Sequence, residues 1–135
     1  MPSRTFLGLD VGDKRVGIAL GDSQVKIAVP FGYLERSDEI IVKLTEIILR
    51  HNVRTIVVGY PRNQSGEPTQ QSAAVERFVE ELADIDIQAE VVYQDESLTS
   101  VEAERRLGRV KDKGEIDAEA ASIILQDYLE EKYAK

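Results

Sequence analysis

The chain has 135 residues, which is enough for a single domain with its own hydrophobic core. The absence of cysteine excludes disulfide bonds and thiolate metal sites, and the absence of a long apolar run excludes a membrane-spanning helix, so we expect a cytoplasmic protein. The formal net charge of −8 weighs against a nucleic-acid partner, unless the basic residues are gathered in one place.

The first third of the sequence has the hydrophobic alternation of an antiparallel sheet. Residues 5–11 and 15–21 alternate in hydrophobicity and are joined by the short turn 12–14, which predicts a β-hairpin. The alternation assigns Leu7, Leu9 and Val11 to one face of the first strand and Phe6, Gly8 and Asp10 to the other, and in the second strand it opposes Val16, Ile18 and Leu20 to Gly17, Ala19 and Gly21. A third strand is expected over 26–34, where Pro30 favours a sheet edge.

The rest of the sequence alternates between helical and strand patterns. The hydrophobic periodicity predicts helices over 37–50, 70–83, 99–107 and 117–132, and strands over 54–59 and 87–93. An antiparallel meander followed by two right-handed βαβ crossovers gives a mixed five-stranded sheet with helices on both faces. The sequence therefore predicts an α/β fold in one domain spanning 1–135. The only histidine, His51, is expected at a helix end, and we assign no chemistry to it.

Acidic residues lie at the ends of two predicted strands. Asp10 stands among apolar residues, where an unpaired charge costs several kcal/mol, so it caps a turn, forms a salt bridge to Lys14 or Arg15, or binds a metal ion. Asp95 and Glu96 follow the last strand, and the carboxyl ends of parallel strands meet at one edge of a sheet. We therefore expect Asp10 and Glu96 at the same edge, although acids in this position are also favoured simply by a following helix N-terminus.

A third acid begins the apolar face of the last predicted helix. Asp117 shares that face with Ala120, Ala121, Ile124 and Tyr128, and capping of the helix is its alternative role. If Asp10, Glu96 and Asp117 converge, three carboxylates need a compensating cation. Oxygen ligands without cysteine select Mg²⁺ or Mn²⁺, and two such ions activate a water and stabilise the leaving oxygen in phosphodiester hydrolysis.

Basic residues gather near these acids in the sequence. One cluster, in the stretch RRLGRVKDK, comprises Arg105, Arg106, Arg109, Lys111 and Lys113, and a smaller one after Asp10 comprises Lys14 and Arg15. We expect these side chains to contact the phosphate backbone of a nucleic acid, which positions a substrate without reading its sequence. A solvated helix end and loop is the alternative interpretation of the larger cluster.

Four stretches carry a family resemblance: GLDVGDKRVGIA (8–19), VVGYPRNQSGEP (57–68), DESLTSVEAERRL (95–107) and KGEIDAEAASIILQDYL (113–129). In these stretches and their order the chain resembles the YqgF (RuvX) family of Holliday junction resolvases, members of the RNase H-like superfamily. The resemblance implies an RNase H-like fold and a metal-dependent nuclease with Asp10, Glu96 and Asp117 as its acids. It also implies a branched DNA or precursor 16S rRNA substrate, cleaved to leave a 5′-phosphate and a 3′-hydroxyl.

Two other functions are compatible with the sequence. One is a phosphate- or nucleotide-binding domain, because LDVG followed by a basic turn resembles the first phosphate loop of the actin and sugar-kinase ATPases. The other is a non-catalytic nucleic-acid-binding domain with the same fold, which fits the net charge of −8 and the departure from the family pattern at Ser97. Arg62 with Gln64 is a further departure. The oligomeric state is open between a monomer and a weak homodimer.

Overall fold

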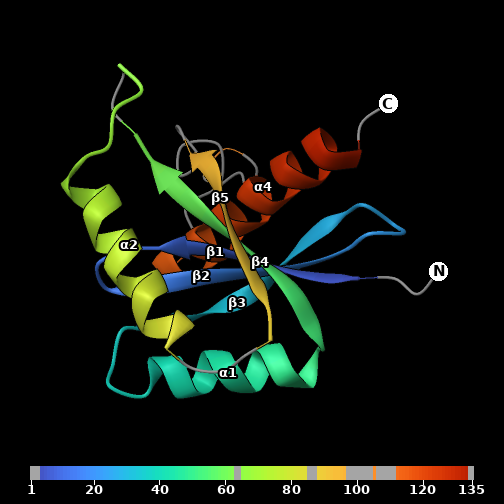
Figure 1. Ribbon diagram of the computed structural model, residues 1–135, viewed down its shortest axis with the longest axis horizontal. Helices are drawn as coiled ribbons and strands as arrows, with labels where there is room; N and C mark the ends of the chain where they lie inside the picture. The colour runs from blue at the N-terminus through green and yellow to red at the C-terminus, as the bar shows by residue number, and fades with distance from the viewer. Residues whose placement is uncertain (1–3, 63–64, 85–87, 97–104, 106–111, 134–135) are drawn as a thin grey trace.

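The computed structural model describes residues 4–62, 65–84, 88–96, 105 and 112–133. The described residues form the strands β1 (Thr5–Val11), β2 (Arg15–Asp22), β3 (Ala28–Glu35), β4 (Val53–Pro61) and β5 (Glu90–Glu96) and the helices α1 (Ile40–Arg50), α2 (Gln70–Ala83) and α4 (Lys113–Tyr133). The strands make a mixed sheet in the order β3-β2-β1-β4-β5, antiparallel across β1, β2 and β3 and parallel across β1, β4 and β5 (Figure 1). The predicted α/β architecture with a mixed five-stranded sheet is confirmed.

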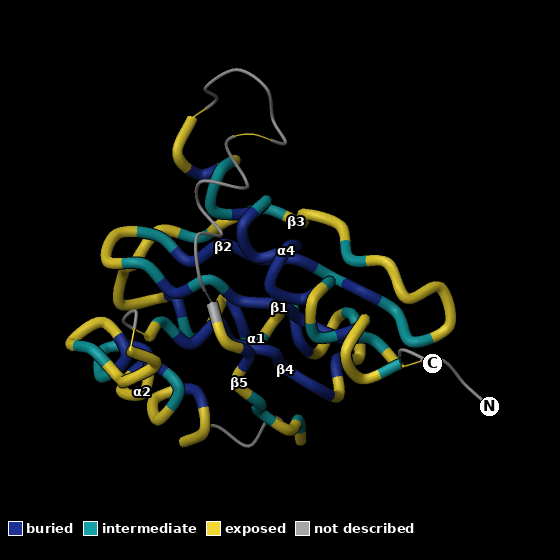
Figure 2. The backbone as a smooth tube through the Cα atoms, turned by 90° about the horizontal axis from the view of Figure 1, so that it is seen from above, coloured by how far each residue is buried: buried dark blue, intermediate teal, exposed yellow. Residues whose placement is uncertain are grey.

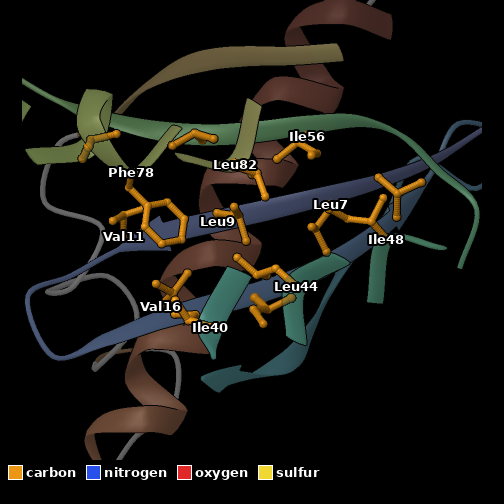
Figure 3. Close-up of a cluster of buried hydrophobic side chains, with 14 residues drawn as sticks. Leu7, Leu9, Val11, Val16, Ile40, Leu44, Ile48, Ile56, Phe78 and Leu82 are labelled. Atoms are coloured by element: carbon orange, nitrogen blue, oxygen red, sulfur yellow. The ribbon is translucent and has the colours of Figure 1, made fainter. Parts of the chain in front are cut away.

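Helices cover both faces of the sheet. On one face the apolar side chains of α1 and α2, such as Leu44 and Phe78, pack against Leu9 of β1 (Figure 3). On the other face Leu125 of α4 packs in a cluster with Phe6 of β1. Between these layers β1 and β4 are buried along most of their length (Figure 2). The predicted division of the hairpin residues between the two faces is confirmed, because odd and even residues of β1 belong to different clusters.

The third strand of the meander lies at the predicted edge of the sheet, but its bounds differ from the prediction 26–34. β3 is an edge of the sheet, as Pro30 indicates, and its pairing with β2 shifts register between Ile18 and Ala19. It begins at Ala28, two residues later than the predicted start. The irregular pairing and the proline make β3 a poor template for a further strand.

The predicted bounds of β5 are wrong. The strand runs from Glu90 to Glu96 instead of over 87–93, so its last three residues are polar. Parallel pairing with β4 continues as far as the partners Pro61 and Glu96. The Gln94 side chain donates a 3.0 Å hydrogen bond from Nε2 to Glu131 of α4. Backbone pairing and this contact extend the strand beyond the apolar run from which its end was predicted.

The predicted start of the last helix is also wrong. α4 begins at Lys113 rather than at 117, and the Asp112 side chain accepts a 2.8 Å hydrogen bond from the backbone N–H of Glu115. Asp112 therefore caps the N-terminus of α4, and the alternative that Asp117 caps this helix is excluded. The predicted helix over 99–107 lies outside the described residues, apart from Arg105. None of the described helices, α4 included, has both the length and the apolar character that crossing a bilayer requires.

Candidate active site at the carboxyl edge of the sheet

Asp10 lies near the end of β1 on the face covered by α4. Its partner across the β1–β2 ladder is Gly17. Directly opposed residues of antiparallel strands share a face, with Cβ atoms about 5 Å apart when both have one. Asp10 is half-buried, and the position beside it carries no side chain. The sheet therefore leaves room next to Asp10 for a group from another element.

The backbone of α4 at Asp117 fills that room. A Cβ atom built on Gly17 would lie 2.0 Å from the carbonyl oxygen of Asp117 and 2.3 Å from its carbonyl carbon. Only glycine permits this approach, so the helix rests directly on the sheet at Gly17. Asp10 and Asp117, which are distant in the sequence, are consequently neighbours across one glycine on the same face.

Arg15 forms an ion pair with Asp117 beside Gly17. Its Nε donates a 2.6 Å hydrogen bond to Oδ2 of Asp117, and each of the two side chains is 24% exposed. Strand alternation explains the contact, because Arg15 lies two residues before Gly17 on the same face of β2. The guanidinium predicted to contact phosphate is thus held by an acid of the site.

Glu96 is the last residue of β5, on the same edge of the sheet. β4 separates β5 from β1, which places the backbones of β1 and β5 roughly 10 Å apart. Position 96 continues the alternation of Val92 and Gln94, whose side chains reach the α4 layer. The side chain of Glu96 lies outside the described part of the structure, so its convergence with Asp10 and Asp117 stays a prediction.

Two of the three predicted metal ligands, Asp10 and Asp117, have described side chains. Among them, no group of three or more His, Cys, Asp or Glu side chains is placed to hold a metal ion. Asp10 and the Asp117 backbone both adjoin Gly17 on one face of the sheet, and carboxylate oxygens are the ligand type that Mg²⁺ and Mn²⁺ prefer. The donor set fits such an ion, with Glu96 as the expected third ligand.

The basic residues predicted to contact phosphate lie on different elements of the structure. Lys14 is exposed at the tip of the β1–β2 hairpin, and Lys113 is exposed at the first residue of α4. Arg105 is also exposed. The remaining members of the larger cluster, Arg106, Arg109 and Lys111, lie outside the described residues.

Nearly the whole sequence matches one protein family. The model of the RuvX family, described as "Holliday junction resolvase", matches residues 4–131. The chain belongs to the RuvX family. A relative from Chloroflexus aggregans, named "Putative pre-16S rRNA nuclease", is 41% identical over 137 residues, with 96% of each chain covered. One with the same name from Synechocystis is 40% identical over 131 residues, covering 92% of this chain and 86% of the relative.

Solved structures share the fold at low identity. RuvC of Thermus thermophilus in complex with a Holliday junction substrate matches with a TM-score of 0.61 and 13% identity, over 96% of this chain and 95% of that chain. Fowlpox virus resolvase with Holliday junction DNA matches with a TM-score of 0.58 and 10% identity, over 96% and 99%. The RNase H-like fold implied by the RuvX resemblance is confirmed. Membership of the RuvX family also confirms the expected nuclease class and favours it over the non-catalytic alternatives.

Arg36 supports the hairpin of this RuvX-family site and is absent from the predicted set. Its backbone N–H donates to the carbonyl of Lys14, and its Nη1 donates to the carbonyl of Gly12, each at 2.8 Å. The guanidinium carbon also lies 4.9 Å from the ring centroid of Phe78 in α2. The residue ties the turn before Arg15 to the body of the protein. Nothing in its local sequence distinguishes it from other exposed arginines.

A second polar cluster lies at the same edge on the opposite face, beside α2. The hydroxyl of Tyr60 donates a 2.7 Å hydrogen bond to Glu76, which raises the pKa of Tyr60 above its usual value. Arg62 donates a 2.8 Å hydrogen bond from Nε to Asp95, which raises the pKa of the guanidinium further. Burial raises the pKa of the neighbouring Tyr93. Asp95 is thereby engaged on the α2 face of the sheet.

Proposed function

We propose that the chain is a divalent-metal-dependent nuclease that hydrolyses phosphodiester bonds in structured nucleic acid, with Asp10, Glu96 and Asp117 as its catalytic acids. The observation that carries the proposal is the contact between the Asp117 backbone and Gly17, which brings Asp117 beside Asp10 on one face of the sheet. Two neighbouring carboxylates repel each other unless cations compensate them. Arg15 supplies one such cation at Asp117, and a bound divalent ion would supply further positive charge between the acids.

Asp10, Glu96 and Asp117 would hold Mg²⁺ or Mn²⁺, with Asp10 as the central ligand. When bound, such an ion supplies a Lewis acid for the phosphoryl oxygen and lowers the pKa of a bound water. The three acids belong to rigid elements, β1, β5 and α4, which would limit the movement of their side chains. Exposed cations flanking the site, Lys14 and Lys113, would attract the phosphate backbone.

The substrate is branched DNA or precursor 16S rRNA. The first is the substrate class in the description of the RuvX family, and the second appears in the names of the sequence relatives. We propose that the protein acts in the cytoplasm as a monomer or weak homodimer. Backbone contacts through lysine and arginine serve DNA and RNA alike, so the choice between them rests on the shape of the substrate.

Cleavage assays test the proposal directly. A four-way DNA junction and a precursor 16S rRNA fragment are each incubated with the protein in Mg²⁺, in Mn²⁺ and in EDTA. We expect metal-dependent cleavage of at least one substrate, and Asp10→Asn should lower the rate by more than about 100-fold, since even outer-shell changes at metal sites cost 10–100-fold. Asp13→Asn is the matched control, because Asp13 is exposed on the same hairpin and the charge change is the same.

Two outcomes contradict the proposal. Cleavage that continues in EDTA, or that Asp10→Asn and Asp13→Asn affect equally, removes the metal-binding role of Asp10. Binding of either substrate without cleavage in any metal supports the non-catalytic alternative instead.

A further inference from the structure

The ion pair between Arg15 and Asp117 links a cation to a proposed metal ligand. Nε of Arg15 lies 2.6 Å from Oδ2 of Asp117, and both side chains are three-quarters buried. Two other salt bridges, Lys43–Glu39 and Arg62–Asp95, each have a much more exposed partner, at 76% for Glu39 and 76% for Asp95. Solvent screens the Arg15–Asp117 pair less than these surface pairs, so its charges act more strongly on anything that binds beside them.

The elements around this ion pair hold it in place. Arg15 belongs to β2, two residues before Gly17, and Asp117 lies directly over Gly17. The turn that precedes Arg15 is closed by a 2.9 Å hydrogen bond from the N–H of Gly12 to the carbonyl of Arg15 and is braced by Arg36. Neither backbone can move away from the other without breaking sheet or helix contacts.

We propose that Arg15 is a built-in counter-ion of Asp117 that lowers the affinity of the carboxylate site for divalent cations. This rests on the proposed function, in which Asp117 is a metal ligand. A guanidinium and a divalent cation compete for the same carboxylate, because both need its oxygens and they repel each other. A cation bound at Asp117 must therefore displace the Arg15 side chain or accept its positive charge as a neighbour.

The size of the effect follows from the behaviour of carboxylates beside arginine. One such cation within 4–6 Å changes the proton affinity of a carboxylate by about 10- to 1,000-fold. A divalent cation bears twice the charge of a proton, although it lies farther from the arginine. We expect removal of the Arg15 charge to tighten cation binding about tenfold, the lower end of this range, because the site is partly exposed.

The test measures Mn²⁺ binding in the absence of nucleic acid, by electron paramagnetic resonance of the free ion. Arg15→Gln should bind Mn²⁺ about tenfold more tightly than the wild type. Arg15→Lys, which keeps the charge, should stay close to the wild type. Arg50→Gln is the control for net charge, because Arg50 is exposed at the end of α1 on the far face of the sheet, and it should not change the affinity. In an Asp117→Asn background, Arg15→Gln should give no gain.

Each result has a defined consequence. Equal or weaker Mn²⁺ binding by Arg15→Gln, together with metal-dependent cleavage, overturns the counter-ion role alone and leaves the proposed function intact. Absence of Mn²⁺ binding in every variant overturns both. A gain in Mn²⁺ affinity that persists in the Asp117→Asn background also overturns the counter-ion role of Arg15, because the effect then does not act through Asp117.

A measurement on the wild-type protein covers the case in which Arg15→Gln does not fold. The Nε–H signal of Arg15, assigned in ¹⁵N NMR spectra by its absence in Arg15→Lys, reports the hydrogen bond to Asp117. We expect this signal to move as Mg²⁺ is added, because the cation takes the carboxylate from the guanidinium. A signal that stays unchanged at saturating Mg²⁺ overturns the proposal.

Discussion

Adding one methyl group at Gly17 moves Asp117 without altering any charge. The Cβ of Gly17→Ala would lie 2.0 Å from the carbonyl oxygen of Asp117, whereas non-bonded heavy atoms prefer about 3.5 Å. The obstacle is helix backbone, so α4 must retreat by roughly 1.5 Å at Asp117 to relieve the contact. Overpacking of this kind costs about 1–3 kcal/mol of stability, and a displacement of 1 Å in a catalytic group costs about 100-fold in rate.

Gly21→Ala is the matched control on the same strand and face. Its Cβ would lie 3.1 Å from Leu125 Cδ2 and from Leu129 Cδ1, which are ends of flexible side chains, and the nearest backbone atom, the carbonyl oxygen of Ile27, is at an ordinary contact distance of 3.5 Å. Urea denaturation gives the stability of both variants, and single-turnover cleavage is then measured where both are fully folded. We expect a rate loss of about 100-fold for Gly17→Ala and little change for Gly21→Ala. Equal rates for the two folded variants would refute the close packing of Asp117 on the sheet as a requirement for activity.

Two further predictions concern the residues around the site. The pKa of Tyr60 is raised because its hydroxyl donates to Glu76, so the folded state holds this proton more tightly than the unfolded state. The resulting stabilisation is complete below the unfolded pKa of about 10 and is lost as the pH rises through the pKa of Tyr60 in the folded state. Urea denaturation from neutral pH to about pH 11 should therefore show that the free energy of unfolding falls more steeply with pH for the wild type than for Tyr60→Phe. Arg36→Ala removes the hydrogen bond to Gly12 and the stacking on Phe78, and it should cost about 1 kcal/mol in the same assay. Unchanged stability in Arg36→Ala would show that the hairpin needs no brace.

The hairpin faces could be predicted because strand alternation leaves little choice. A shift of one residue would turn Leu7 and Leu9 to the face covered by α4 and place Asp10 in the apolar cluster beneath α1, so the register of β1 is strongly determined. The end of β5 could not be predicted in the same way. Gln94 is polar, and its place in the strand depends on Glu131, which the chain brings to it only through the final helix.

Asp10 and Asp117 could be selected from the sequence because each breaks an apolar pattern. Their proximity follows from Gly17, whose lack of a side chain lets α4 touch the sheet. The small face of the second strand was visible in the sequence, but it did not say which helix residue would rest on which glycine. That choice depends on where α4 begins and on its angle across the sheet, which many distant contacts decide together.

The role of Arg15 shows the same dependence most clearly. In the sequence Arg15 is close to Asp10 and adjacent to Lys14, which favours either a local salt bridge or a phosphate contact. Its guanidinium instead binds Asp117, 102 positions away. A helix that started at Asp117 would leave this carboxylate at the N-terminus, where its natural partners are backbone N–H groups. Because α4 starts at Lys113 and Asp112 serves its N-terminus, Asp117 lies on the second turn, against the sheet and within reach of Arg15. The difference of about one helical turn between the predicted and the observed start of α4 therefore decides the role of Asp117: it is an acid paired with Arg15 and not a helix cap.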